Sequence, residues 1–377
     1  MRKPLLLILL LAGTALSARA REPAGPWGLA VRYYRSLTAP KAWLDSARVL
    51  QPRFRWTVGV EGSTIRSGVD LESDLSLYDF TGENASHAQG TLSFGMQNRL
   101  YKKAGLRVAY GSLGAGYGVE IGRKGSERNT YFTFGSLTPS FGYQIQYYRT
   151  HQHVSGTLSM EGSEPADFSS AWPGEMRNIA LSGFYAFNRH RFVFSSAYSG
   201  RILQRRSAGS WLVTAKYTQG DFALDPRDTD LRERMNDLSR FSTRQFFLGG
   251  GYSYNWVLMH RDPADPDTWK GVRNLTANAT LLPMVSFLHH IQTEQGEGAS
   301  LKRIRHGGLP NLSPCLRGAV CYSWDRYCLN LQAVYNRLDF QGADTESRQA
   351  EGQQRSTLRT RGVFYDLSAK LQFCVKF

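Results

Sequence analysis

The end of the chain, Asp366 to Phe377, alternates strictly between apolar and polar side chains. The apolar set comprises Leu367, Ala369, Leu371, Phe373, Val375 and Phe377, and the intervening set comprises Asp366, Ser368, Lys370, Gln372, Cys374 and Lys376. Successive side chains of a β-strand point to opposite faces, so this pattern predicts a strand with one apolar and one polar face. The aromatic last residue is typical of the closing strand of a bacterial outer-membrane β-barrel.

The other end of the chain has the features of a cleaved secretory signal over residues 1–20. Arg2 and Lys3 supply the positive start, Leu5–Ala12 the apolar run and Ala18-Arg19-Ala20 a small-x-small cleavage site. A membrane-anchoring helix is the alternative, but a spanning helix needs about 20 predominantly apolar residues. No cysteine lies near the cleavage site, which argues against a lipoprotein. We therefore expect an exported protein, with residues 21–50 as an N-terminal periplasmic segment and 51–377 as the barrel.

The composition excludes a helical membrane protein but suits a membrane barrel. The mean hydropathy is −0.39, although Phe, Trp and Tyr make up 12% of the chain and glycine occurs 37 times. In a membrane barrel only alternate strand residues face lipid, whereas the lumen and loops are polar. Many glycine and tyrosine residues also fit strands that pack closely beside one another.

The net charge limits the kinds of partner that we expect. The formal charge is +15, and loss of the signal's three cations, Arg2, Lys3 and Arg19, leaves +12. An exported chain rarely meets nucleic acid, so we expect no nucleic-acid partner; outer-membrane lipids and lipopolysaccharide phosphates are the expected neighbours. The charges are scattered along the chain, which favours solvated loops and a polar lumen over a specific anion site.

Alternating segments recur along the whole mature chain. In the first of them, Phe54, Trp56, Val58 and Val60 alternate with polar residues and glycine. Further strands are predicted near 63–71, 91–100, 105–112, 130–137, 140–149, 176–187, 191–198, 207–218, 244–258, 272–287, 316–340 and 356–377. Short connections are predicted at 101–104 and 188–190, a flexible strand or turn at 111–118, and long polar loops at 150–175 and 219–240.

These segments predict an all-β fold, an antiparallel transmembrane β-barrel of about 12 strands (range 10–14) with short periplasmic turns and longer outer loops. An open sheet in lipid would leave unpaired edge N–H and C=O groups, so the sheet must close. An even strand count places both termini at one end, which we expect to face the periplasm. A β-sandwich or a periplasmic barrel would also alternate, but aromatic residues near the strand ends favour the membrane form.

All four cysteines lie in the last fifth of the chain, and export permits disulfides. Cys328 and Cys374 both fall on the polar face of their strands, so a Cys328–Cys374 bridge is possible if the two strands are neighbours. Cys315 and Cys321 would then close a small loop, and a set of free thiols is the alternative. No C-x-x-C pair occurs, which gives a zinc site or thioredoxin-like chemistry little support.

Histidine offers the main candidates for chemistry. His151 and His153 share a spacing that could present two metal ligands, but no third ligand is evident. His289 and His290 lie at a predicted strand end, yet no spacing with serine singles out a catalytic triad. We predict no catalytic residue, no cofactor-binding residue, no metal site and no cofactor.

Several segments resemble a known family. The segments are FGYQIQYY at 141–148, QRRSAGSW at 204–211 and GGGYSYNWV at 249–257, with KGS at 124–126 and TYF at 130–132. They are similar to the domain-of-unknown-function family 4421 of Bacteroidota cell envelopes. The resemblance implies an envelope location and a barrel-like fold, and it brings no established activity and no catalytic residue.

The sequence as a whole favours a non-enzymatic outer-membrane barrel with a structural, binding or small-solute role. The alternatives are a barrel-embedded enzyme that modifies lipid or lipopolysaccharide through His151, His153, His289 or His290, and a subunit of a secretion or surface-assembly complex. About twelve strands enclose a lumen that side chains can fill or that leaves a narrow passage.

Overall fold

The computed structural model describes most of the chain beyond the N-terminal region. The described residues are 44–51, 54–79, 86–97, 100–122, 128–234, 238–264, 269–295, 302–307, 311–341, 345–348 and 355–377. The predicted signal at 1–20, and the segment that follows it up to residue 43, lie outside these ranges.

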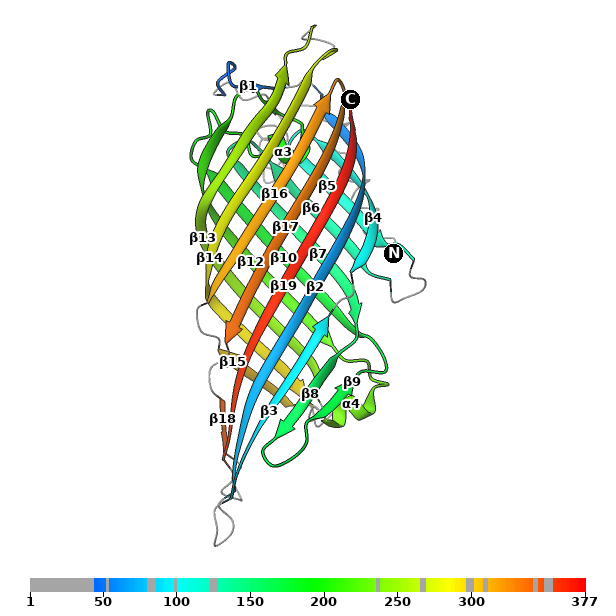
Figure 1. The fold of residues 1–377 in the computed structure, drawn as a ribbon, viewed down its shortest axis with the longest axis vertical. Helices are drawn as coiled ribbons and strands as arrows, with labels where there is room; N and C mark the ends of the chain where they lie inside the picture. The colour runs from blue at the N-terminus through cyan, green and yellow to red at the C-terminus, as the bar shows by residue number, and fades with distance from the viewer. Residues whose placement is uncertain are drawn as a thin grey trace, which may run out of the picture.

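Twelve antiparallel strands close into a barrel, each paired with the next and the last paired with the first (Figure 1). In ring order they are β2 (Trp56–Asp79), β4 (Tyr101–Tyr110), β5 (Leu113–Glu120), β6 (Thr130–Leu137), β7 (Phe141–Gln152), β10 (Gly174–Ala186), β12 (Ala208–Ala223), β13 (Leu238–Arg261), β14 (Arg273–Gln295), β16 (Leu312–Trp324), β17 (Tyr327–Gln341) and β19 (Arg355–Lys376). The strand count agrees with the prediction.

The other described elements extend the barrel or cover its ends. The wall is lengthened by β3 (Ser86–Gln97), β8 (Ser155–Met160), β9 (Ala166–Ser169), β15 (Lys302–Gly307) and β18 (Thr345–Arg348), whereas β1 (Val49–Leu50) and β11 (Leu203–Gln204) form a separate two-stranded sheet. The described residues contain two short helices, α3 (Ser195–Ser199) and α4 (Thr229–Arg234). Within the described ranges, no helix combines the length and the apolar character that a membrane crossing requires.

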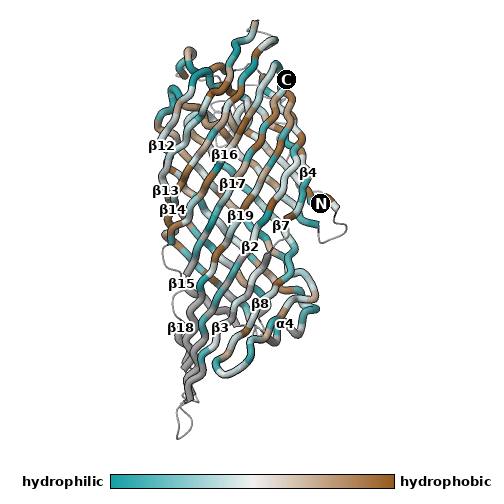
Figure 2. The backbone as a smooth tube through the Cα atoms, in the orientation of Figure 1, coloured by the Kyte–Doolittle hydropathy of each residue, from teal (hydrophilic) through white to brown (hydrophobic). Residues whose placement is uncertain are grey.

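The wall is apolar outside and polar inside, as the alternation predicts. On β19, Leu371 is 52% exposed on the outer face, whereas its neighbour Gln372 is 3% exposed and faces the lumen. The other barrel strands also expose apolar side chains on the outer face and bury polar ones on the inner face. Figure 2 shows hydrophobic and hydrophilic residues interleaved along the strands. Large apolar side chains are therefore exposed, and many polar ones are buried.

The two ends of the barrel differ in their connections. At one end, the turn end, β16 passes to β17 through Asp325 and Arg326 alone, and β4 passes to β5 through Gly111 and Ser112. Phe377 also lies at the turn end, where its N–H donates to the Trp56 carbonyl at 2.9 Å. The opposite end, the loop end, carries most of the longer connections, as predicted, but two long connections lie at the turn end: 187–207, between β10 and β12, and 262–272, between β13 and β14.

Several predicted boundaries are wrong although the count is right. Residues 316–340 form two strands, β16 and β17, whereas 54–60 and 63–71 belong to one continuous strand, β2. The glycine-rich segment 111–118, predicted as a flexible strand or turn, contains a turn and most of a barrel strand, β5, whereas 101–104, predicted as a short connection, lies inside β4. The predicted loop 150–175 holds the β8–β9 hairpin.

The segment 191–198, predicted as a strand, instead enters the lumen. Residues 187–207 connect β10 to β12 at the turn end, and we call them the plug; α3 lies within it (Figure 1). Phe192 and Phe194 are buried there. Aromatic and β-branched residues such as Phe192, Val193 and Phe194 are typical of strands, but both rings pack against the inner wall.

The inner wall presents an apolar patch that matches the plug. Phe194 stacks on Tyr198 with ring centroids 4.5 Å apart, and it also contacts Phe184 of β10. The buried wall residues around them are Leu212, Phe247, Leu282, Met284, Cys315 and Ala319, from β12, β13, β14 and β16. Burying each large apolar side chain contributes about 1.5–3 kcal/mol, so this patch holds the plug to one side of the lumen.

Amide side chains of the wall fix the plug's backbone. Asn255 donates to the Val193 carbonyl at 2.8 Å, and Gln332 donates to the Tyr198 carbonyl at 2.9 Å. Asn330 donates to the Ala197 carbonyl. The plug is not part of the barrel's strand ladder, so these side chains pair its buried carbonyls instead. This stabilises the plug, because an unpaired buried polar group is costly.

Gly200 ends α3 at the most crowded point of the plug. Its φ is 57°, and a Cβ there would lie 2.5 Å from Ser323 Oγ and 2.8 Å from Cys321 Sγ. Only glycine adopts this left-handed conformation without strain and also fits the space.

Replacing Gly200 with alanine tests the plug's placement. We expect Gly200→Ala to lower the free energy of unfolding by at least about 1–2 kcal/mol, the cost of a left-handed L-residue, with crowding against Ser323 in addition. Chemical unfolding of the detergent-purified protein measures it. Gly62→Ala is the matched control, since a Cβ there meets nothing within 4 Å. Equal stability of the two variants would contradict the plug's position.

Candidate functional site

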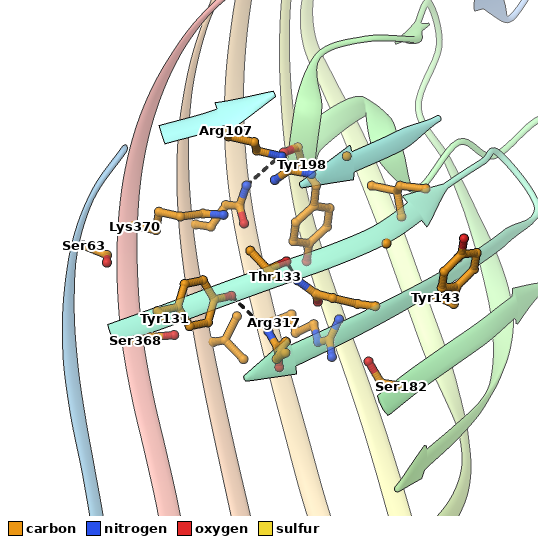
Figure 3. A pocket seen from close by; sticks show the side chains of 18 of the residues that line it. Ser63, Arg107, Tyr131, Thr133, Tyr143, Ser182, Tyr198, Arg317, Ser368 and Lys370 are labelled. Atoms are coloured by element: carbon orange, nitrogen blue, oxygen red, sulfur yellow. Dashed lines mark hydrogen bonds between the residues drawn. The ribbon is translucent and has the colours of Figure 1, made fainter. Parts of the chain in front are cut away.

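A polar cavity occupies the lumen directly beyond the plug. Its volume is about 180 Å³, and Phe194 and Tyr198 of the plug border it on one side. The rest of its lining comes from the barrel strands, and Figure 3 shows side chains pointing into it from several of them. We call this space the lumen cavity.

Cationic side chains dominate the charge of the lumen cavity. They are Lys103 and Arg107 of β4, Lys216 of β12, Arg317 of β16 and Lys370 of β19. One carboxylate, Asp366, lines the cavity with them, and a second, Glu61, lies 3.8 Å from the Lys370 Nζ. Described cations therefore outnumber described carboxylates around the cavity, which makes it attractive to anions.

The cations are only partly satisfied by protein groups. The Lys103 ammonium lies 3.3 Å from the centroid of the Tyr131 ring, a cation–π contact. The Nε of Arg317 is buried and makes no hydrogen bond to any residue that the structure describes. A buried donor without a partner costs about 1–3 kcal/mol, a cost that a bound acceptor would remove.

The neutral part of the lining is held in place by side-chain hydrogen bonds between β6 and β7. Gln144 donates to Thr133 Oγ1 at 3.1 Å, and Gln146 donates to the Tyr131 hydroxyl at 3.3 Å (Figure 3). These pairs keep Tyr131 beneath the Lys103 ammonium. The wall opposite the plug is thus a preorganised polar surface.

The sequence did not single out this site. The alternation of residues 366–377 predicts that Lys370 lies on the polar face of its strand. Nothing in the sequence connects Lys370 with Lys103, Lys216 and Arg317. Each strand contributes only one or two cations, and their convergence follows from ring closure. The available signal was a cation on the polar face of alternating segments far apart in the chain.

The four candidate histidines are not brought together. His289 is buried and its Nε2 lies 3.1 Å from the Gln245 amide, whereas His290 is exposed on the outer face. His151 is the penultimate residue of β7, and the Nδ1 of His153 lies 3.2 Å from the Ser170 carbonyl oxygen. Three strands separate β7 from β14, so the two pairs do not share a site. Within the described ranges, no cluster of three or more His, Cys, Asp or Glu residues suits a metal ion.

The cysteines form a cluster at the root of the plug. Cys321, Cys328 and Cys374 are buried in mutual contact, and the Cys328 thiol lies 3.6 Å from the Ser199 carbonyl. Cys328 and Cys374 are direct partners across β17 and β19, so the condition for a possible bridge, that the two strands are neighbours, is met. All four cysteines are free thiols in the structure, so the Cys328–Cys374 bridge stays a prediction.

The predicted Cys315–Cys321 loop does not fit this fold. Both residues lie on β16, six positions apart along one extended strand. That spacing separates their Cα atoms by about 20 Å, at about 3.3 Å per residue. A disulfide needs Cα atoms within about 7 Å, so these two thiols cannot bridge each other here.

Comparison with solved structures returns outer-membrane barrels at low similarity. The outer membrane protease OmpT from Escherichia coli shares 7% identity and a TM-score of 0.30, with 84% of this chain and 97% of that chain covered. The toluene transporter TodX from P. putida shares 9% identity and a TM-score of 0.20, with 84% and 90% covered. The outer-membrane expressed OmpT of Vibrio cholerae shares 9% identity and a TM-score of 0.20, with 80% and 98% covered.

No curated protein matches the chain. A family model does match, namely the one described as Domain of unknown function (DUF4421), over residues 90–264. The match runs from β3 through β13 and includes the whole plug. This match supports the resemblance to the DUF4421 family that the sequence indicates.

Proposed function

We propose that the protein is an outer-membrane β-barrel that binds a small anionic solute in its lumen and is closed at the turn end by its own plug. The observation that carries the proposal is the excess of cations around the lumen cavity, with the Nε of Arg317 buried and unpaired among the described residues. The role is binding or restricted passage and involves no chemical step.

The membrane placement rests on the outer wall. Exposed apolar side chains recur on the outer faces of the barrel strands, among them Val213, Leu248, Leu316 and Leu371. Water would not tolerate so large an apolar surface, whereas hydrocarbon would favour it. Aromatic side chains gather near the turn end, as in an interfacial girdle. The ring centroid of Trp324 lies 5.7 Å from that of Tyr327 and 6.3 Å from that of Phe373.

The orientation and the source are further parts of the proposal. We infer that the turn end faces the periplasm, since the last residue, the short turns and the plug all lie there. The loop end then faces the cell exterior. Cleavage of the signal after Ala20 and a source among Bacteroidota remain predictions from the sequence.

The lumen role follows from the position of the plug. Residues 187–207 fill the turn end, so a solute that enters from the loop end would stop at the surface formed by Phe194 and Tyr198. Five basic side chains would hold an anion there through charge-assisted hydrogen bonds. Passage to the periplasm would require the plug to move.

A charge on the outer wall tests the membrane placement. We expect Leu367→Arg to lower the free energy of unfolding in lipid vesicles by about 2–4 kcal/mol, because Leu367 is exposed on β19 six residues from the aromatic girdle, so a cation there must leave water near the bilayer midplane. Leu367→Ala is the control, since it removes the same side chain without adding charge. Folding is followed by heat-dependent migration in SDS gels. Recovery of wild-type protein without detergent in an osmotic-shock fraction would contradict the placement.

Inorganic phosphate serves as the probe of the lumen cavity. We expect phosphate to raise the melting temperature of the purified protein relative to chloride at equal ionic strength, since a ligand that binds only the folded state stabilises it by RT ln(1 + [L]/Kd). The double variant Arg317→Gln/Lys370→Gln should lose at least tenfold in phosphate affinity. Arg337→Gln, an exposed residue of β17 paired with Asp339, should keep it. Equal phosphate responses in all three proteins would overturn the lumen assignment.

A further inference from the structure

A second group of arginines lies on the outer face of the wall, near the loop end. Arg149 of β7 and Arg177 of β10 are register partners. They share the outer face of their strands with the exposed residues Ile145 and Ile179. The polar group therefore begins where the apolar wall stops, within two residues of Ile179.

One carboxylate, that of Glu175, holds both of these arginines in place. Glu175 accepts from Arg149 Nε at 2.8 Å and from Arg149 Nη2 at 3.1 Å, and it also accepts from Arg177 Nε at 2.5 Å. On the next strand, Asp221 lies 3.5 Å from the Nη2 of Arg240. Arg177 donates to Glu175 through its Nε. The two Nη groups of Arg177 are not part of that hydrogen bond.

A hollow of about 180 Å³ lies among these groups. It is lined by Glu175, Arg177, Asp221, Ala223 and Arg240, and the small Ala223 side chain leaves its floor open. The guanidinium groups are more exposed than the carboxylates: Arg177 and Arg240 are 55% and 45% exposed, and Glu175 and Asp221 are each 24% exposed. The hollow thus presents donors outward and keeps its acceptors recessed.

The charges around the hollow favour an anion. Arg244 of β13 is also exposed, and its register partner on β12 is Gln219, two residues from Asp221. With Arg149, Arg177 and Arg240, it makes four described arginines in this region of the outer face. The carboxylates that face the group are Glu175, Asp221 and, from β14, Glu294, the register partner of Arg240. Arginine forks match phosphate oxygens in geometry, and each additional N–H contact is charge-assisted.

We propose that this outer hollow binds a phosphate group of lipid A, the membrane anchor of lipopolysaccharide. The site adjoins apolar wall at Ile179, so its ligand carries acyl chains as well as a phosphate. It lies near the loop end, which places it in the outer leaflet. This assignment rests on the membrane placement and orientation proposed above, but it does not depend on the lumen cavity.

Native mass spectrometry of the purified protein with added lipid A tests the proposal. We expect wild type to retain lipid A and Arg177→Gln/Arg240→Gln to lose at least tenfold in affinity. Ala223→Leu fills the hollow without changing charge, and it should weaken binding by a similar factor. Arg337→Gln is the matched control, because Arg337 is also an exposed, ion-paired arginine of the barrel strands. It should bind within twofold of wild type.

Two further probes identify the source of the phosphate. Equal affinity for phosphatidylglycerol would show a general attraction to anionic lipid and would overturn the assignment to lipid A. Displacement of lipid A by equimolar inorganic phosphate would overturn a lipid site altogether. So would unchanged lipid A binding in both hollow variants.

Failure here can be told apart from failure of the proposed function. Heat-dependent migration reports whether each variant still forms the barrel. The phosphate response of the lumen, probed through Arg317 and Lys370, should persist in the hollow variants. If barrel formation and the phosphate response of the lumen are both intact but lipid A selectivity is absent, only the outer site is contradicted.

Discussion

Closure of the hydrogen-bond ladder between the first and last barrel strands is the constraint on which the structure depends. β19 pairs with β2 from Arg355 opposite Tyr78 to Lys376 opposite Thr57, without a register shift. In hydrocarbon, each unpaired N–H or C=O would cost several kcal/mol, so a wall of this length is viable only without an open edge. The long β2–β19 ladder supplies that closure, and it fixes which residues face inward.

Once the ring is closed, the inner wall divides into two regions with different partners. The side built from β12, β13, β14 and β16 carries the apolar patch that receives Phe192 and Phe194 of the plug. The remaining wall carries polar and cationic residues such as Lys103 and Lys370, which meet the lumen cavity instead. The plug therefore satisfies the part of the lumen that water would solvate poorly, and it leaves the charged part open to a solute.

Period-two alternation predicted the fold class, the outer face and the number of strands, but the number was right through compensating errors. The segment 191–198 resembles a strand because aromatic and β-branched residues are typical of strands, yet Phe192 and Phe194 pack on the inner wall of the barrel as part of the plug. The segment that contains most of β5 is predicted only as a flexible strand or turn, because glycine leaves no clear alternation between Gly111 and Gly118. The lumen cations were missed for another reason: they converge only through ring closure, which a local pattern does not contain.

A single bulge shows how far such local patterns reach. On β14, Phe246 pairs with Leu288 and Phe247 with Ser286, so Phe287 is an extra residue in the ladder. Val285, before the bulge, and Phe287, the extra residue, are both exposed, and Leu288 follows on the same outer face. The face of every later residue is thereby reversed, which turns His289 into the lumen beside Gln245 and leaves His290 outside. Because the strand period is two, one inserted residue decides whether a titratable side chain meets the lumen or the outer surface. The sequence alone therefore does not assign either histidine to a face, because it does not show the bulge. The same alternation of side chains between the two faces keeps the lumen cations and the outer arginines on opposite sides of one wall.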